Sequence, residues 1–275
     1  MVSDQVNGGL PMALIADTHI HIYPSVDAAL LIEHAMRRLR HLSPKSGDIV
    51  ALFLAEGRGH DVFSSLSNNA VDLSGMSVAG HEESEALLLK HKSLGEVWVF
   101  AGRQIVTAEK LEVLALTMQD VVEDGQPIGR VIDSVIETGG IPVLSWAPGK
   151  WFSRRGEVVE KVINEYKPGR ILIGDTSLRP LGWPEPSVMK RASAMGFGII
   201  AGSDPLPIHG EERQAGRYAA RCELSFDSCK PVTSVRSGLK DPSIRIDRIG
   251  RRNSWPEMLS RLYRHHSGKR RENAG

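Results

Sequence analysis

The chain has 275 residues, of which 34 are Lys or Arg and 33 are Asp or Glu, so its formal net charge is +1. This balance produces no overall field that would attract a nucleic acid or a membrane surface, and we expect neither as a partner. With 41% hydrophobic and 24% charged residues, and no apolar run near the roughly 20 residues of a membrane span, the composition indicates an ordinary globular protein.

The N-terminal segment 1–11 is expected to be a flexible lead-in, because two glycines and Pro11 interrupt any regular structure. It has neither the basic start nor the long apolar stretch of a secretory signal. The two cysteines, Cys222 and Cys229, are too few for a disulfide scaffold and lack the spacing of a metal-binding pair. These features favour a cytoplasmic protein.

The sequence ALIADTHIHI at 13–22 predicts a buried strand that begins with an apolar run. Side chains alternate between the two faces of a strand, so Asp17, His19 and His21 share one face. Burying a carboxylate and two imidazoles without partners is costly. A divalent metal would satisfy them, because Zn, Mn and Fe prefer these ligands. A hydrogen-bonded polar network without a metal is the alternative.

Helices and strands alternate after this strand. A helix at 26–42 and a strand at 48–56 come first, and a further strand is predicted at 110–118. From residue 126 three helix–strand units follow, with helices at 127–140, 156–169 and 185–196 and strands at 141–146, 170–175 and 197–204. This order favours a (β/α) barrel, with a doubly wound open sheet as the alternative. The irregular segment 67–96 fits an edge hairpin, a lid or a dimer contact.

The C-terminal residues 241–275 differ in composition and form a basic extension. A short helix is predicted at 255–266, and the last eight residues are expected to be disordered. Such a tail can contact RNA or anionic lipid, but the neutral charge of the whole chain favours a solvated tail.

Acidic or imidazole groups also finish other predicted strands, and catalytic residues of barrels lie at strand ends. Glu56, Asp175 and Asp204 each follow an apolar run. Taken singly these signals are weak, because Asp175 can cap a turn and Asp204 can form an Asx turn. His60 and His209 are lone loop histidines that are compatible with solvent exposure.

Four segments in order resemble the motif series of the PHP family (polymerase and histidinol phosphatase). They are DTHIHI at 17–22, AGRQIVTAEKLEVLAL at 101–116, GGIPVLSWAPG at 139–149 and GIIAGSD at 198–204. The resemblance covers about residues 13–210. It implies an α/β fold, namely a distorted (β/α)7-type, TIM-like barrel in one domain at 12–240, with a phosphoesterase site for two or three metal ions. The first and last motifs also suit the wider amidohydrolase-type barrels.

The resemblance assigns metal-binding roles to residues at matching positions. His19 and His21 match the first pair of histidine ligands, and Asp204 matches the aspartate of the final motif. Glu56 falls near the acid-and-histidine segment that follows the second strand of the family, with His60 only loosely in register.

The chain also departs from the family pattern. Gln104 stands where the family has Glu, and Glu112 where it has His. Trp146 and Ala147 occupy another histidine motif, and Leu206 replaces the last histidine. A glutamine oxygen can bind a metal but brings no charge, and a tryptophan supplies no ligand. A full cluster of three metals is therefore not expected.

The predicted site combines these observations. The expected ligands of one Zn, Mn or Fe ion are Asp17, His19, His21, Glu56 and Asp204. The predicted catalytic groups are Glu112, Asp204 and His209. The predicted substrate-binding groups are Arg103, Gln104 and Arg179. A site without any metal stays open as the alternative.

The favoured function is a PHP-like metal-dependent hydrolase, specifically a phosphoesterase with a reduced site that acts on a small anionic substrate. A catalytically impaired member that serves as a binding or regulatory subunit is the alternative. An amidohydrolase-like enzyme is a lesser alternative, because it would need a carboxylated lysine or a further histidine at a strand end. The sequence does not indicate an oligomeric state.

Overall fold

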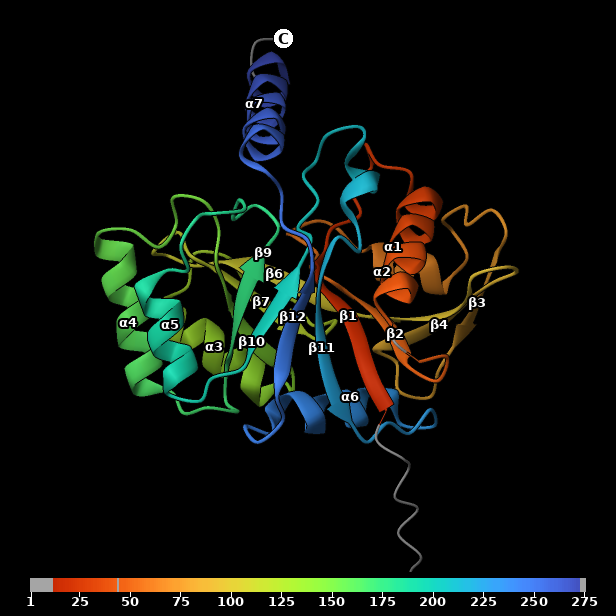
Figure 1. Ribbon diagram of the computed structural model, residues 1–275, viewed down its shortest axis with the longest axis horizontal. Coiled ribbons are helices and arrows are strands. Elements are labelled where there is room, and N and C mark those ends of the chain that lie inside the picture. The colour runs from red at the N-terminus through yellow and green to blue at the C-terminus, as the bar shows by residue number, and fades with distance from the viewer. Residues whose placement is uncertain (1–11, 44, 273–275) are drawn as a thin grey trace, which may run out of the picture.

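The computed structural model describes residues 12–43 and 45–272, with side chains up to residue 267 (Figure 1). The predicted lead-in 1–11 and the last three residues of the predicted extension lie outside this part. The strands are β1 (Met12–Ile20), β2 (Ile49–Leu54), β3 (Met76–Gly80), β4 (Ala86–His91), β5 (Gly95–Phe100), β6 (Gly102–Val106), β7 (Glu112–Leu116), β8 (Ile141–Ser145), β9 (Leu172–Thr176), β10 (Ile199–Gly202), β11 (Tyr218–Leu224) and β12 (Ile246–Gly250). The helices are α1 (Ala28–Leu42), α2 (Val62–Ser67), α3 (Ile128–Glu137), α4 (Arg154–Glu165), α5 (Ser187–Ala194), α6 (Pro231–Lys240) and α7 (Trp255–Glu272), with a 3-10 turn, η1 (Glu211–Gln214).

Strand β1 confirms the strand predicted from the ALIADTHIHI motif. Residues 13–22 are all buried. β1 pairs with β2 in parallel and with β11 in antiparallel orientation, so it lies inside a sheet, which explains its apolar start. Its register with β2 shifts between Asp17 and Ile20, within the segment that carries the first histidine. Such irregularities re-aim side chains and are common beside functional sites.

The strands form two sheets of mixed direction. The seven-stranded sheet has the order β12-β11-β1-β2-β5-β4-β3, and the five-stranded sheet has the order β10-β9-β8-β7-β6. The described part of the chain therefore has the predicted α/β class. The predicted TIM-like barrel is not confirmed, because no continuous ladder of paired strands closes the described strands into a barrel. The physical reason is the set of antiparallel pairs β6–β7, β7–β8 and β4–β5, which a uniform (β/α) repeat does not contain.

The two sheets approach each other at two seams. At one seam the N–H of Glu56 donates to the carbonyl of Gly102 (3.0 Å), and the N–H of Gln104 donates to the carbonyl of Glu56 (2.8 Å). At the other seam the N–H of Asp204 donates to the carbonyl of His19 (3.0 Å). Both seams thus lie at residues of the predicted site.

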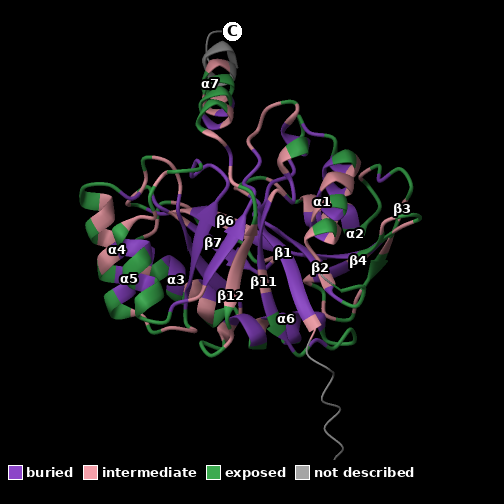
Figure 2. Ribbon diagram, in the orientation of Figure 1, coloured by how far each residue is buried: buried purple, intermediate pink, exposed green. Residues whose placement is uncertain are grey.

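Helices flank both sheets, and the buried residues gather on the strands between them (Figure 2). α1 and α2 lie beside the seven-stranded sheet, whereas α3, α4 and α5 lie beside the five-stranded sheet (Figure 1). α1 confirms the predicted amphipathic helix: it buries Leu31, Ala35 and Leu39, and the side chain of Asp27 caps its first turn. A further apolar cluster contains residues of both sheets, including Phe53 of β2.

The irregular segment 67–96 contains the edge of the seven-stranded sheet. β3 and β4 form an antiparallel pair, and β3 is the outermost strand, so the segment contains the edge hairpin that the sequence allowed.

The C-terminal region continues the fold. β12 at 246–250 pairs with β11, and α7 extends to Glu272, beyond the helix predicted at 255–266 and into the residues expected to be disordered. α7 projects from the body of the molecule (Figure 1). None of the helices in the described part of the chain combines the length and apolar character needed to cross a bilayer.

Candidate metal centre

Three side chains from segments far apart in the sequence converge at the carboxyl end of β1. His19 lies on β1, His21 lies just after it, and both were predicted as metal ligands. Asp204, a third predicted ligand, lies just after β10. One ligand atom from each lies within 4.8 Å of the others, and all three residues are buried. The Nε2 atoms of the two histidines are 3.0 Å apart, and they lie 3.6 and 3.7 Å from Oδ1 of Asp204.

A fourth candidate ligand atom, an amide oxygen, joins this cluster. Oε1 of Gln104, on β6, lies 3.0 Å from Nε2 of His19. A neutral imidazole can donate a hydrogen bond from only one ring nitrogen, yet Nε2 of His19 faces this oxygen, the nitrogen of His21 and a carboxylate oxygen. One proton cannot satisfy all these lone pairs. A cation among them would.

The spacing also suits a metal ion. Bonds of 2.0–2.2 Å in a tetrahedral site place neighbouring ligand atoms about 3.3–3.6 Å apart. Four of the six separations between the candidate ligand atoms, namely those of His19 to the other three residues and of His21 to Asp204, run from 3.0 to 3.7 Å. The donor set of two imidazoles, one carboxylate and one amide oxygen is acceptable to Zn, Mn or Fe.

Burial controls the electrostatics around these ligands. Burial and the adjacent His19 ring lower the pKa of His21 well below its ordinary value, which keeps its imidazole neutral. Tyr23 stacks on His21, with ring centroids 5.2 Å apart. Burial, together with the charges of Asp204 and Glu112, raises the pKa of the Tyr23 hydroxyl, so that hydroxyl stays protonated and can donate a hydrogen bond.

Asp17 lies beside the cluster but has other partners. Its Oδ1 accepts from the N–H of Ser203 (2.9 Å) and of His19 (3.3 Å), and its Oδ2 accepts from the N–H of Gly216 (2.8 Å). Burial raises its pKa to about 6, although these N–H groups oppose the rise. The structure therefore does not bring the Asp17 carboxylate into the cluster, and instead uses it to tie β1 to the two segments that follow β10.

A glycine permits the close approach of β10 to β1. A Cβ atom on Gly202 would lie 2.3 Å from Cβ and 2.6 Å from the backbone nitrogen of His19. Any side chain here would push β10 away from the first histidine. Gly202 thus sets the distance across which Asp204 reaches the cluster.

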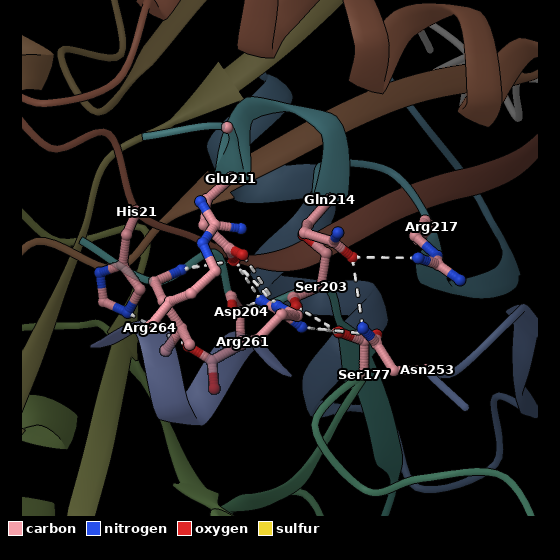
Figure 3. Close-up of polar contacts among 12 residues, drawn as sticks. His21, Ser177, Ser203, Asp204, Glu211, Gln214, Arg217, Asn253, Arg261 and Arg264 are labelled. Carbon is pink, nitrogen blue, oxygen red and sulfur yellow. Dashed lines mark hydrogen bonds and ion pairs between the residues drawn. The ribbon is translucent and has the colours of Figure 1, made fainter. Parts of the chain in front are cut away.

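Asp204 has a left-handed backbone, with φ of 51°, which is unfavourable for a residue other than glycine. A buried ion pair holds this segment in place (Figure 3). Nη2 of Arg261, on α7, donates to the carbonyl of Asp204 (2.8 Å) and to Oε2 of Glu211 (2.5 Å). Nε of Arg261 also contacts both carboxylate oxygens of Glu211, and Nη1 donates to Oγ of Ser177 (3.1 Å).

Glu56 is buried on the other side of the site and is engaged by an arginine. Nη1 of Arg103 donates to its Oε2 (2.9 Å), and the N–H of Phe63 donates to its Oε1 (2.8 Å). Arg103 also donates to the carbonyls of His60 and Gln119. The predicted ligand Glu56 and the predicted substrate-binding Arg103 therefore pair with each other and clasp the seam between β2 and β6.

The structure also separates Arg179 and His209 from the cluster. Arg179 forms a buried ion pair with Asp175 (Nη2 to Oδ2, 2.5 Å), to which Tyr218 and Arg248 also donate. Its guanidinium is thus already neutralised. His209 is exposed to solvent.

Glu112 lies near the cluster on the β6–β7 hairpin. It stands opposite Val106, two residues along from the Gln104–Leu114 pair and on the same face. Nζ of Lys150 lies 3.2 Å from its Oε1. Beside Gln104, a cavity of about 320 Å³ is also lined by the cationic side chains of Arg58 and Arg103 and by several carboxylates, among them Glu56. Within the described residues Arg58 forms no ion pair.

Several residues at this site were missed by the sequence reasoning. Tyr23 could have been found, because it continues the alternation of the two histidines on β1. Lys150 follows the APG turn without any pattern that marks it. Glu211 and Arg261 lie in segments rich in charged residues, and only the folded chain shows that this pair is buried.

No protein-family model matches this chain, and no curated protein matches it. Among solved structures, PsfC from Pseudomonas syringae PB-5123 is similar with a TM-score of 0.56 at 16% identity, over 92% of this chain and 98% of PsfC. An endonuclease Q bound to a 27-mer duplex with an abasic lesion has a TM-score of 0.48 at 12% identity, over 90% and 67%. A two-domain protein of Bacteroides vulgatus ATCC 8482 with a predicted PHP-like metal-dependent phosphoesterase has a TM-score of 0.46 at 12% identity, over 94% and 71%. The chain shares the fold of PsfC over nearly its whole length.

Proposed function

We propose that the chain is a metal-dependent phosphoesterase whose single divalent ion is held by His19, His21 and Asp204, with the oxygen of Gln104 as a fourth ligand. The observation that carries this proposal is the convergence of four lone-pair atoms with too few protons to satisfy one another. When bound, the ion supplies a Lewis acid for a phosphoryl oxygen and lowers the pKa of a coordinated water to about 7. The motif order that resembles the PHP family supports a phosphate ester as substrate.

The surrounding residues divide the remaining tasks. Glu112 is the proposed proton acceptor, because it shares a face with Gln104 and its charge reaches the hydroxyl of Tyr23. Lys150 pairs with Glu112 and offsets its charge at the edge of the site. Arg58 is the proposed anion-binding group of the adjoining cavity, since Arg103 is engaged by Glu56. Asp17 and Glu56 serve the proposed site by holding its segments together.

A second candidate function is a binding or regulatory protein that has lost turnover. It is favoured because two carboxylates that were predicted as metal ligands have other partners: Asp17 accepts from backbone N–H groups, and Glu56 is paired with Arg103. Only one carboxylate then offsets the charge of a divalent ion.

Metal analysis of protein purified without added metal tests the metal site. We expect about one equivalent of Zn, Mn or Fe in the wild type and none in a His19→Ala/His21→Ala variant. The matched control is His34→Ala/His91→Ala, which removes two histidines outside the cluster and should keep its metal. Equal metal contents in all three proteins would refute the assignment.

Activity distinguishes the two functions. With Mn added, the wild type should hydrolyse members of a panel of phosphate monoesters and diesters, and Glu112→Gln should lose about 10²–10⁴-fold in kcat while keeping its metal. Metal binding without hydrolysis of any panel member would instead support the binding protein.

A further inference from the structure

A basic groove lies between α1 and the adjoining ends of β11 and β12. Its volume is about 780 Å³, and the charged side chains that line it are all arginines: Arg37, Arg38, Arg217 and Arg251, with His41 beside them. The net charge of the whole chain is only +1, so this concentration of positive charge is a local property of the fold. The first three residues come from α1, and the other two come from segments more than 170 residues later.

Carboxylates neutralise only part of this charge. Glu33 pairs with Arg37 (2.5 Å), and Glu257 pairs with Arg217 (3.1 Å). Arg38 donates to a backbone carbonyl rather than to a carboxylate. No ion pair of the Arg251 side chain is found within the described residues. Two guanidinium groups therefore keep uncompensated charge in the groove.

The effect of this crowding is visible at Arg38. Partial burial, together with the neighbouring Arg217, lowers its pKa. A fold that holds like charges together without a structural counterion has a standing attraction for an anionic ligand. The groove is open and has arginines on both walls, so it suits an extended anion with several negative charges.

We propose that this groove binds the phosphodiester backbone of a nucleic acid. Arginine forks match phosphate oxygens, and backbone contacts of this type need no particular base sequence. Arg37 and His41 are one helical turn apart, about 6 Å along α1. Together with Arg217 and Arg251 on the opposite wall, they can engage more than one phosphate of a strand at once, which a single free phosphate would not require.

The groove is distinct from the candidate metal centre but lies next to it. Gly216 lines the groove, and its N–H donates to Oδ2 of Asp17 (2.8 Å), two residues before His19. The proposal goes beyond the phosphoesterase function and does not need it, because the groove contains none of the metal ligands. The even charge balance of the chain predicted no nucleic-acid partner. The net charge sums over the whole surface, however, whereas a ligand contacts only one part of it, and this groove is locally basic.

Fluorescence anisotropy with a labelled 20-nucleotide single strand and the matching duplex tests this proposal. The assay contains EDTA, so failure of the metal site cannot affect it. We expect wild-type binding that weakens steeply with salt, since each phosphate contact contributes about 0.7 to the slope of log K against log salt for a single strand. Arg37→Gln/Arg251→Gln should lower that slope by about 1.4 and weaken binding roughly tenfold.

Two further variants make the test specific. Arg154→Gln/Arg170→Gln removes two exposed arginines that do not line the groove and should bind like the wild type. Lys269→Gln/Arg270→Gln/Arg271→Gln removes the basic C-terminal run. If binding is lost in this triple variant and unchanged in Arg37→Gln/Arg251→Gln, the proposal is overturned. It is also overturned if the wild type binds neither oligonucleotide at 50 mM salt, or binds only vesicles with anionic lipid.

Discussion

Replacing Arg261 by methionine should be among the most damaging single changes in this chain. Arg261 is 3% exposed and Glu211 is 1% exposed, and three nitrogen–oxygen contacts of 2.5–3.1 Å join them. Methionine keeps the side-chain length but leaves a buried carboxylate unpaired. Removing one partner of a buried pair costs about 3–5 kcal/mol, so we expect the free energy of unfolding to fall by that amount.

Urea denaturation at pH 7 measures this loss, and two variants isolate its cause. Glu211→Gln/Arg261→Met removes both charges but keeps an oxygen for the N–H of Leu206, so it should lose no more than about 2 kcal/mol. Arg264→Met, on the exposed side of the same helix, should cost less than about 1 kcal/mol. The reasoning is refuted if Arg261→Met is no worse than Arg264→Met, or if the double variant is as unstable as the single one.

The same variants report on the candidate metal centre. Arg261 donates to the carbonyl of Asp204, whose backbone has a positive φ, so its loss frees the proposed ligand to relax. Outer partners of this kind typically contribute 10- to 100-fold in metal affinity. Competition with a fluorescent chelator should show that loss in the stable double variant and full affinity in Arg264→Met.

Two further predictions concern a glycine and a helix cap. Gly202→Ala should lower the free energy of unfolding in urea by about 1–3 kcal/mol and lower the metal content, because the new Cβ would meet the backbone of His19. Gly57→Ala, which has open space around its Cβ position, should be nearly neutral. Equal effects of the two substitutions would contradict the packing argument. Ser254 and Glu257 form a capping box at the start of α7, in which the Ser254 N–H donates to Glu257 Oε2 (2.7 Å) and lowers the pKa of that carboxyl to about 2. Glu257→Ala should lower the free energy of unfolding by about 1 kcal/mol at pH 7. Because the pKa of Glu257 is lower in the folded state than in the unfolded state, this loss should shrink as the pH falls from about 4.5 toward 2. A loss that does not change with pH would contradict this sign.

Much of the secondary structure could be predicted from the sequence because its causes are local. The apolar spacing of 26–42 produced α1 as expected, and the three later helix–strand units correspond to α3–β8, α4–β9 and α5–β10. Strand direction was a different matter. β7 and β8 are antiparallel although a helix separates them, and no pattern within either strand records which neighbour it will meet. The sheet arrangement therefore departed from a regular barrel.

The candidate site shows the same division. Period-two alternation predicted one shared face for Asp17, His19 and His21, and the structure brings the two histidines together. The sequence could not say that Asp17 would be saturated by N–H donors from segments about 190 residues away. Nor could it show that Arg103 would form an ion pair with Glu56.

What the sequence by itself determined is the location of the candidate site: two imidazoles at the end of a buried strand, where their burial demands a partner. The tertiary structure alone decided which partners they meet. Asp204 and Gln104 reach the histidines across the two seams between the sheets, and Gly202 and Arg261 hold that approach in place. The physical reason is that alternation along a strand is a property of consecutive residues, whereas the distance between two strands is set by everything packed around them.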